Sequence, residues 1–488
     1  MNDKPTQKPK RQLSPQRSKN GKFSQSAGRS QGKPYGKSQG KHQGKPAPMR
    51  KQAIVRDSVK TRRAAAMALQ DILKNGTVLE QALSSLADYN ELSARDRAFA
   101  RAIVATTFRR FAQIQAALKP LLRKAPPAFT MAVLQTATAQ ILYLKTPPHA
   151  AVGETVDLLK SRASSKGFAN MANGVLRNIV RDGAKTAAAV APSANIPGWI
   201  RTNWEKTYGK AELRKMAARL MKDPVLDLQI NGDADEWAQQ LGGTKIGQQT
   251  VRLQSIGDVT SLEGFEQGHL WAQDIAASLP VQVAKSLAGP LSGKKVLDLC
   301  AAPGGKTLQL AAMGAQVTAL DRSEKRLKRL EENLTRTKLS ADIVCADGLE
   351  WDNTEQYDLI LLDAPCSATG TFRRHPDVLY NRTPKILSEL TKLQDKLLKN
   401  AVNWLKPDGI LIYSVCSLQS EESVPRIRRF LRELPDFRLI SIPSSINADL
   451  GLDLPEIRFE GGTLRSLPSD LPNDGGMDGF FIAAFRRK

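Results

Sequence analysis

Cysteine is scarce in this 488-residue sequence, and the four cysteines that do occur are not arranged in pairs. None belongs to a C-x-x-C motif, and all fall in the last 190 residues, as Cys300, Cys345, Cys366 and Cys416. This spacing excludes a disulfide framework and a cysteine-based zinc site. It is typical of a reducing compartment, and we expect no bound metal.

Long apolar runs are also missing. No run approaches the roughly 18 residues that a membrane helix needs, and the beginning of the chain contains no apolar signal core. The sequence therefore predicts a cytoplasmic protein with no membrane attachment.

Acidic residues are too few to balance the basic ones. Lys and Arg number 72 against 48 Asp and Glu, which gives a formal charge of +24. This surplus favours a polyphosphate partner, although a basic but inert surface would give the same count. Residues 1–52 carry +13 of the charge, because they hold 14 Lys and Arg and a single acid, Asp3.

The same segment is rich in Gln, Lys, Gly, Ser and Pro, with the loosely repeated phrase "QGK". A segment of this composition cannot bury enough apolar surface to offset its ordering entropy, so we predict a disordered basic arm. Nonspecific attraction to RNA and simple solubilisation both remain open as its role.

Helical periodicity organises the next part of the chain. Apolar residues recur at spacings of three and four in "RRAAAMALQDIL", "RAFARAIVATTF" and "MAVLQTATAQILYL". The breakers "NGT", "KAPP" and "TPP" separate these stretches. We predict a compact bundle of about six helices within residues 53–190. By itself such a bundle could be a scaffold, a protein-binding module or an RNA clamp.

The pattern then changes twice. After the linker "AVAPSANIPGW", residues 191–288 mix helical pieces such as "AELRKMAARLM" with the strand-like pieces "DLQIN" and "QQTVRL". We interpret them as a small α+β module. In residues 289–488 strands and helices alternate, as in a doubly wound parallel sheet. The predicted fold is therefore multidomain: an all-α bundle, a small α+β module and a C-terminal α/β domain of Rossmann-like type.

The α/β domain can be divided into elements. Strands are expected at residues 295–299, 316–320, 342–345, 357–362 and 409–414. Helices are expected at residues 323–334 and 384–405, and the final "GFFIAAF" would be a late strand, antiparallel at the edge of the sheet.

The first expected strand runs into "DLCAAPGGKT", a turn of small residues before a helix. Gly304 and Gly305 let the backbone approach a ligand, and free amides at the helix start favour a negative group. A nucleoside-triphosphate loop, G-x-x-x-x-G-K-[ST], is excluded because Cys300 stands where its first glycine belongs.

Acidic residues follow the next two strands. Asp321 in "TALDRS" lies 23 positions after Asp298, where it can accept hydrogen bonds from the ribose hydroxyls of an adenosine cofactor. A nicotinamide dinucleotide would require the same acid, but its G-x-G-x-x-G turn is absent. Asp347 in "CADG" ends the third strand, near the expected adenine. The cofactor predicted from these features is S-adenosylmethionine.

Two cysteines follow later strands: Cys366 in "LLDAPCSATG" and Cys416 in "LIYSVCSLQSEE". Ligands bind at the carboxyl edge of such a sheet, so both thiols should face one crevice. A single cysteine would more often be a buried structural residue. Two thiols at matched strand ends, one beside an acid and a proline, favour chemistry instead.

Thiols suit methylation of a cytosine ring. Carbon 5 of cytosine is a poor nucleophile, and a thiolate that adds to carbon 6 turns the ring into an enamine able to attack an electrophilic methyl group. Asp363 can hold the exocyclic amine and ring nitrogen 3 as charge develops. The second thiol would help to remove the proton from carbon 5. These residues alone do not decide which thiol is the nucleophile.

With these motifs in place, the chain resembles the RsmB/Sun/Fmu family of bacterial ribosomal RNA cytosine-5 methyltransferases, within the wider Nop2/Sun group. The resemblance runs from about Arg56 to the end. "ARDRAFA", "PPHAAVGETVDLL" and "NGVLRNIVR" are similar to the family's NusB-like RNA-binding domain. "VLDLCAAPGGKT", "LLDAPCSATG", "RRHPD", "SVCS" and "DGFF" are similar to its catalytic core.

The resemblance assigns roles to individual residues. It implies contact with S-adenosylmethionine or its surroundings for Cys300, Ala301, Ala302, Pro303, Gly304, Gly305, Lys306, Asp321, Asp347 and Asp363. It further implies that Cys416 is the nucleophile and that Cys366 assists product release. The implied substrate is small-subunit ribosomal RNA, and a monomer is expected. Transfer RNA, another ribosomal site, or a non-catalytic RNA-binding assembly factor are the alternatives.

Three features depart from the family pattern. Val415 replaces the threonine usual before the nucleophile, which would remove a hydrogen bond near the thiol. Leu379 and Tyr380 stand in "HPDVLYNR" where Lys and Trp are common, and this bears on which nucleotide the loop accepts. The basic arm is outside the resemblance.

Overall fold

The computed structural model describes residues 56–254 and 257–488. The predicted basic arm, residues 1–52, lies outside these ranges. Within them, no helix combines the length and the apolarity needed to cross a bilayer.

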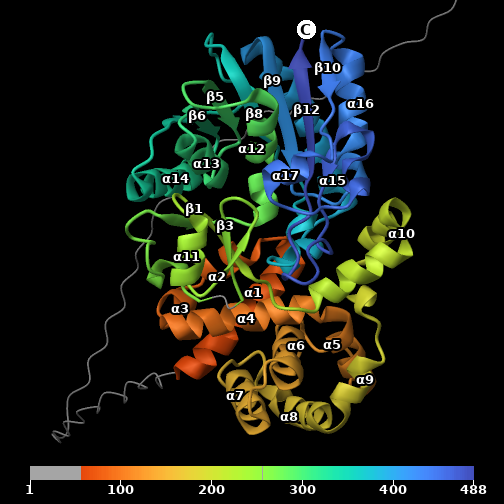
Figure 1. Ribbon diagram of the computed structural model, residues 1–488. Coiled ribbons are helices and arrows are strands. Elements are labelled where there is room, and N and C mark those ends of the chain that lie inside the picture. Colours follow the sequence, from red (N-terminus) through yellow and green to blue (C-terminus); the bar gives the residue numbers. More distant parts are fainter. Residues whose placement is uncertain (1–55, 255–256) are drawn as a thin grey trace, which may run out of the picture. The chain divides into compact units, whose positions relative to one another are not determined.

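Helices make up the first described region (Figure 1). They are α1 (Asp57–Asn75), α2 (Leu79–Ser84), α3 (Ala87–Asn90), α4 (Ala94–Arg109), α5 (Phe111–Leu118), α6 (Ala128–Tyr143), α7 (Pro148–Lys160), α8 (Ala169–Asn178) and α9 (Ala184–Ala188). Up to residue 182 of the described chain, six of these helices have eight residues or more, in agreement with the predicted bundle. The short α2 and α3 follow the "NGT" breaker.

Local signals explain the helix ends. α1 ends at Gly76, whose positive φ of 71° suits a residue without a β-carbon. α4 begins after Ser93, whose side chain accepts a hydrogen bond from the Asp96 amide at 3.1 Å. One apolar core that includes Leu69, Phe108 and Leu134 is shared by α1, α4 and α6.

The segment predicted as a linker packs against this bundle. The Asn195 side chain is fully buried and accepts a hydrogen bond from the backbone amide of Ala112 at 2.9 Å. The next helix, α10 (Gly198–Leu220), is broken at Gly209, where φ is 81°, and its second half corresponds to the predicted helical piece "AELRKMAARLM". A four-stranded antiparallel sheet follows, in the order β2-β3-β1-β4. It contains β1 (Leu226–Ile230), β2 (Thr244–Ile246), β3 (Thr250–Leu253) and β4 (Leu270–Ala272), with α11 (Ala234–Gln240) beside it.

An eight-stranded sheet forms the C-terminal part, with strand order β10-β12-β9-β8-β5-β6-β7 and β11 paired to β12. Its strands are β5 (Lys295–Leu299), β6 (Gln316–Asp321), β7 (Asp342–Cys345), β8 (Tyr357–Asp363), β9 (Leu405–Val415), β10 (Phe437–Ile440), β11 (Leu464–Arg465) and β12 (Phe481–Arg487). The helices around it are α12 (Ile275–Ala288), α13 (Gly305–Ala312), α14 (Glu324–Thr337), α15 (Pro384–Ala401), α16 (Val424–Glu433) and α17 (Ile446–Leu450).

The predicted parallel strands are present, with two corrections. The late strand β12 is antiparallel, but it lies between β9 and β10 rather than at the edge (Figure 1). The helix predicted to reach residue 405 ends at Ala401, and Leu405 already begins β9. The backbone of a strand alternates its side chains between two faces, and both faces of this sheet are covered.

That alternation can be followed along single strands. Leu359 and Leu361 of β8 pack with α12 on one face, whereas Ile360 and Leu362 pack with α15 on the other. α12 lies within the residues predicted for the α+β module, yet it contacts strands β8 and β9 of the large sheet and the neighbouring helix α13. The domain boundaries at residues 190 and 288 stay predictions.

Candidate active site

The turn after β5 brings the backbone close to α14. Cys300 and Gly304 have positive φ values of 69° and 106°. A β-carbon on Gly304 would come within 2.3 Å of the Leu330 side chain, so a larger residue would force the turn away from the helix. The glycine of the "PGG" motif is therefore required by this close approach.

Asp321 ties the end of β6 to that turn. Its buried carboxylate accepts hydrogen bonds from the amides of Ala302 at 3.1 Å and Ser323 at 2.9 Å. A cavity of about 100 Å³ opens beside it. Three of the predicted cofactor-binding residues line this cavity, namely Cys300, Asp321 and Asp347. The predicted residues in the strand-end turns thus meet at one place.

Asp298, in β5, is a fully buried carboxyl group. One oxygen accepts a hydrogen bond from the Thr307 hydroxyl at 2.6 Å, and the other has no hydrogen-bond partner among the described residues. Burial disfavours the charged form and raises its pKa to about 7. The group is therefore poised to change charge near neutral pH.

Lys306 and Asp363 form an ion pair next to the cysteines. The Lys306 ammonium lies 2.7 Å from the Asp363 carboxylate, which also accepts a hydrogen bond from the Ser414 hydroxyl at 2.8 Å. Burial acts to lower the pKa of Lys306, but the Asp363 carboxylate outweighs it and the net pKa is raised. The ring of Phe480 lies 5.3 Å from the ammonium. The pair holds the Lys306 ammonium at a fixed position in a largely buried site.

The two predicted thiols meet directly. The Sγ atoms of Cys366 and Cys416 are 3.4 Å apart, where either can donate a hydrogen bond. This hydrogen bond, together with burial, raises the pKa of Cys366 well above its usual range. Cys366 is therefore a neutral thiol at physiological pH, able to donate to its neighbour. Cys345, by contrast, is exposed.

The serine after each thiol contacts one buried carboxylate, Glu422. The Glu422 side chain accepts hydrogen bonds from the hydroxyls of Ser367 and Ser417, both at 2.5 Å. Sequence reasoning missed this residue. Its only signal is a place six residues after Cys416 in "SEE", where an acid would ordinarily be solvated.

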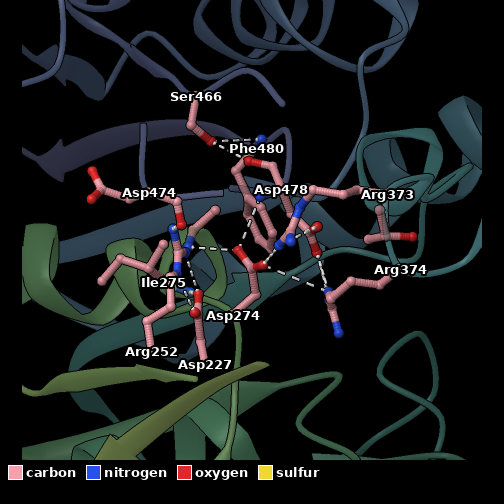
Figure 2. Close-up of polar contacts among 12 residues, drawn as sticks. Asp227, Arg252, Asp274, Ile275, Arg373, Arg374, Ser466, Asp474, Asp478 and Phe480 are labelled. Atoms are coloured by element: carbon pink, nitrogen blue, oxygen red, sulfur yellow. Dashed lines mark hydrogen bonds and ion pairs between the residues drawn. The ribbon is translucent and has the colours of Figure 1, made fainter. Parts of the chain in front are cut away.

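Two arginines of the "RRHPD" segment are paired with buried carboxylates (Figure 2). Arg373 is fully buried and contacts Asp274, and Arg374 donates to Asp478 at 2.9 Å. The Asp478 amide in turn donates to Asp274 at 3.0 Å. Because Asp478 precedes Phe480 by two residues, this network also fixes the aromatic ring beside the lysine.

The same segment contacts the helical bundle. Arg109 of α4 donates to the backbone oxygen of Arg373 at 2.7 Å, and the amide of Leu79 donates to Asp377 at 3.0 Å. Tyr380 packs against two bundle phenylalanines, with ring centroids 5.2 and 4.9 Å away. The loop that begins at one thiol is thus bound to the bundle at its other end.

Known proteins share both parts of this arrangement. Residues 286–486 match the family described as 16S rRNA methyltransferase RsmB/F, and residues 59–181 match the NusB family. The ribosomal RNA small subunit methyltransferase B of Cronobacter sakazakii is 32% identical over 458 residues, covering 89% of this chain and 100% of that protein. The protein of the same name from Vibrio cholerae is 31% identical over 453 residues, covering 88% and 98%.

The chain belongs to the RsmB/F methyltransferase family. It is an S-adenosylmethionine-dependent RNA methyltransferase with a NusB-like helical region. A likeness in fold extends to the crystal structure of PH0851, with a TM-score of 0.68 at 21% identity over 88% of this chain and 99% of that one.

The residues at the ends of β6 and β7 fit S-adenosylmethionine. Asp321 and Asp347 line the cavity at the ends of β6 and β7, where carboxylates can accept hydrogen bonds from an adenosine. The part that each predicted cofactor-binding residue plays stays a prediction.

The departures from the family pattern have structural counterparts. Val415 is fully buried in the core on the α15 face, and the hydroxyl of Ser414 instead reaches Asp363. Leu379 is buried and Tyr380 faces the bundle, where its hydroxyl donates to the backbone oxygen of Asn195 at 2.5 Å. Tyr380 therefore adapts the loop to the bundle, whereas Leu379 packs in the apolar core around α10.

Proposed function

We propose that this enzyme transfers a methyl group to carbon 5 of a cytosine in small-subunit ribosomal RNA, through a covalent bond between Cys416 and carbon 6. The observation that carries the proposal is the 3.4 Å contact between the Cys366 and Cys416 sulfur atoms beside the Lys306–Asp363 pair. The relatives from Cronobacter sakazakii and Vibrio cholerae are named for small-subunit ribosomal RNA, which supports the substrate.

The first step is addition of a thiolate to the ring. The family resemblance makes Cys416 the nucleophile, and Cys366, as a neutral thiol, can donate a hydrogen bond that stabilises the Cys416 thiolate. Asp363 can accept a hydrogen bond from the exocyclic amine of cytosine. The Lys306 ammonium, 2.7 Å from Asp363, offsets the negative charge that develops on the ring.

The second step is methylation and release. S-adenosylmethionine, when bound, supplies an electrophilic methyl group on a sulfonium. Carbon 5 of the enamine would take that methyl group as the bond between the methyl carbon and the sulfonium sulfur breaks, and the sulfur would leave as the thioether of S-adenosylhomocysteine. The proton on carbon 5 must then leave before the bond between carbon 6 and Cys416 can break. The electron pair of the carbon–hydrogen bond then restores the ring double bond and expels the thiolate.

Cys366 is suited to accept that proton. The largest cause of its raised pKa is the hydrogen bond with Cys416, and that bond is lost once Cys416 is bonded to carbon. Cys366 then ionises more easily, passes its proton to water and becomes a base close to carbon 5. The same contact thus keeps it neutral before addition and frees it afterwards.

RNA must reach this site as an unstacked base, because carbon 5 and carbon 6 are inaccessible in a helix. We propose that the NusB-like bundle binds the RNA around the target. The bundle contacts the loop after Cys366, which supports a role in presenting RNA to the thiols. The basic arm would add nonspecific attraction.

The test is methyl transfer from labelled S-adenosylmethionine, with mapping of 5-methylcytosine. The substrates are naked small-subunit ribosomal RNA, assembling small subunits and transfer RNA. We expect product from the wild type, none from Cys416→Ala, and a trapped protein–RNA adduct with Cys366→Ala on a denaturing gel. Cys345→Ala is the matched control, because that thiol is exposed and outside the site.

Other outcomes would point elsewhere. Product on transfer RNA alone would keep the chemistry and change the substrate. Absence of 5-methylcytosine on every substrate would overturn the proposal and favour a non-catalytic assembly factor.

A further inference from the structure

The loops that carry the two thiols converge on a carboxylate that takes no part in the proposed reaction. Glu422 lies in a short 3₁₀ turn, Ser420–Glu422, and is fully buried. It is not among the residues that line the cofactor cavity beside Asp321. A buried carboxylate is retained at a cost unless hydrogen bonds replace the lost water.

Four donors replace that water, two on each oxygen. Oε1 accepts from the Ser367 amide and the Gln394 side chain, both at 2.9 Å. Oε2 accepts from the hydroxyls of Ser367 and Ser417, both at 2.5 Å. The donors come from three segments: the loop after β8, the loop after β9, and α15.

The two serines immediately follow the two thiols in the chain. Inside the sheet, β8 and β9 are held in register up to the pair Asp363–Ser414. Beyond that pair the strand ladder ends, and the loops need other contacts to stay together. One is the hydrogen bond from the Gly370 amide to the Cys416 carbonyl at 3.0 Å. Next to the thiols, the hydroxyls of Ser367 and Ser417 lie 2.9 Å apart, and Glu422 accepts a hydrogen bond from each of them.

We propose that Glu422 is a positioning residue that sets the separation of the Cys366 and Cys416 sulfur atoms for methyl transfer. This inference rests on the proposed function, in which both sulfur atoms act in succession on one ring. Glu422 acts through Ser367 and Ser417. A displacement of either loop would break a hydrogen bond to a buried charge, so the carboxylate resists it.

The test uses the full chain with Glu422→Gln, which keeps the shape but turns one acceptor oxygen into a donor amide. The matched control is Glu421→Gln, since the neighbouring Glu421 is exposed. Ser417→Ala is a milder variant, because Glu422 keeps its other three donors.

The first readout is thiol spacing, which needs no RNA. Phenylarsine oxide bridges two adjacent thiols, forming two arsenic–sulfur bonds and releasing one water. We expect wild type and Glu421→Gln to bind it between Cys366 and Cys416, as mapped by mass spectrometry. Glu422→Gln should bind it at least tenfold more weakly, and Cys366→Ala should not form the bridge.

The second readout is the split between kcat and KM. Glu422→Gln should lose about 10- to 100-fold in kcat, the size expected when hydrogen bonds to a charged group are lost. KM for RNA and for S-adenosylmethionine should stay within about twofold of wild type, because binding surfaces are untouched. Ser417→Ala should show a smaller loss, also in kcat.

Three results would overturn the inference: unchanged arsenical binding in Glu422→Gln, an unchanged kcat, or a loss confined to KM. If Glu422→Gln does not fold, Ser417→Ala takes its place in the test. A kcat and an arsenical affinity equal to those of wild type in Ser417→Ala would then overturn the inference. Failure of wild type to make 5-methylcytosine would instead count against the proposed function, and the arsenical result would still decide whether Glu422 sets the thiol spacing.

Discussion

Replacement of Asp298 with asparagine should change how the stability of the enzyme depends on pH. The carboxyl group is fully buried, with one oxygen bonded to the Thr307 hydroxyl at 2.6 Å and the other unpartnered in the described chain. Burial raises its pKa to about 7 from its usual value of 3.8. An asparagine side chain has a carbonyl oxygen that can accept the hydrogen bond from the Thr307 hydroxyl, but it cannot ionise.

The magnitude follows from the two pKa values. Below pH 4 the carboxyl group is protonated in both the folded and the unfolded chain, so its contribution to stability is fully present. Between about pH 4 and pH 7 the unfolded chain loses the proton while the folded chain keeps it, and stability falls as pH rises. At about 1.36 kcal/mol per pH unit, the interval of about three units corresponds to roughly 4 kcal/mol. Above pH 7 both states are ionised and the loss is complete.

The assay compares urea unfolding of wild type and Asp298→Asn from pH 4.5 to pH 8.5, followed by tryptophan fluorescence and far-ultraviolet circular dichroism. Titrating groups that do not interact with Asp298 cancel in the difference between the two proteins. The variant should gain stability relative to wild type as pH rises to about 7, by an amount on the order of 3 to 4 kcal/mol. Parallel pH profiles would refute the reasoning, because they would mean that Asp298 has the same pKa in both states.

Two further outcomes follow from buried contacts. Arg252→Met leaves the buried Asp227 carboxylate without its bidentate partner (Figure 2). It should lower the free energy of unfolding, measured by urea denaturation, by about 3 to 5 kcal/mol. Adding Asp227→Asn should recover at least about 2 kcal/mol in the same experiment. A double variant as unstable as the sum of the single variants would contradict this. Gly304→Ala should weaken S-adenosylmethionine binding at least tenfold, as measured by calorimetry, and leave RNA affinity unchanged. The reason is that the new methyl group would lie 2.3 Å from the Leu330 side chain of α14. Equal cofactor affinity in the variant would show that the turn can move.

The inner parallel strands of the large sheet, β5, β6, β8 and β9, were predictable because they are largely buried and end in recognisable turns. The place of β12 was predicted wrongly, although its own residues carried a usable signal. Phe481 and Ile482 point to opposite faces and both are buried, as expected for an interior strand. Beyond β12 the edge strand is β10, which is only four residues long, has an exposed Arg438 and was not predicted. The opposite edge strand, β7, is as short and as exposed, but the "CADG" turn at its end marks its position.

In the candidate site, too, some residues could be predicted from the sequence and one could not. Cys366, Cys416 and Asp363 could be found because each follows a predicted strand and the topology brings strand ends together. Glu422 could not be found, because nothing local separates it from the exposed Glu421 beside it. Burial of an acid depends on donors from distant segments, and the α15 donor lies 28 positions away.

The loop that begins at Cys366 is held at both ends before any RNA arrives. Near the thiol, Ser367 is bonded to Glu422, and farther along the loop Asp377 accepts from the bundle. Movement of either end would leave a buried polar group unpaired, which is costly in a dry interior. In the proposed mechanism two sulfur atoms act in turn on one ring, and they would gain most from such fixed geometry, because each avoids a search for its reacting carbon. Under the proposed mechanism, the contacts between bundle and loop therefore serve the chemistry as well as the fold.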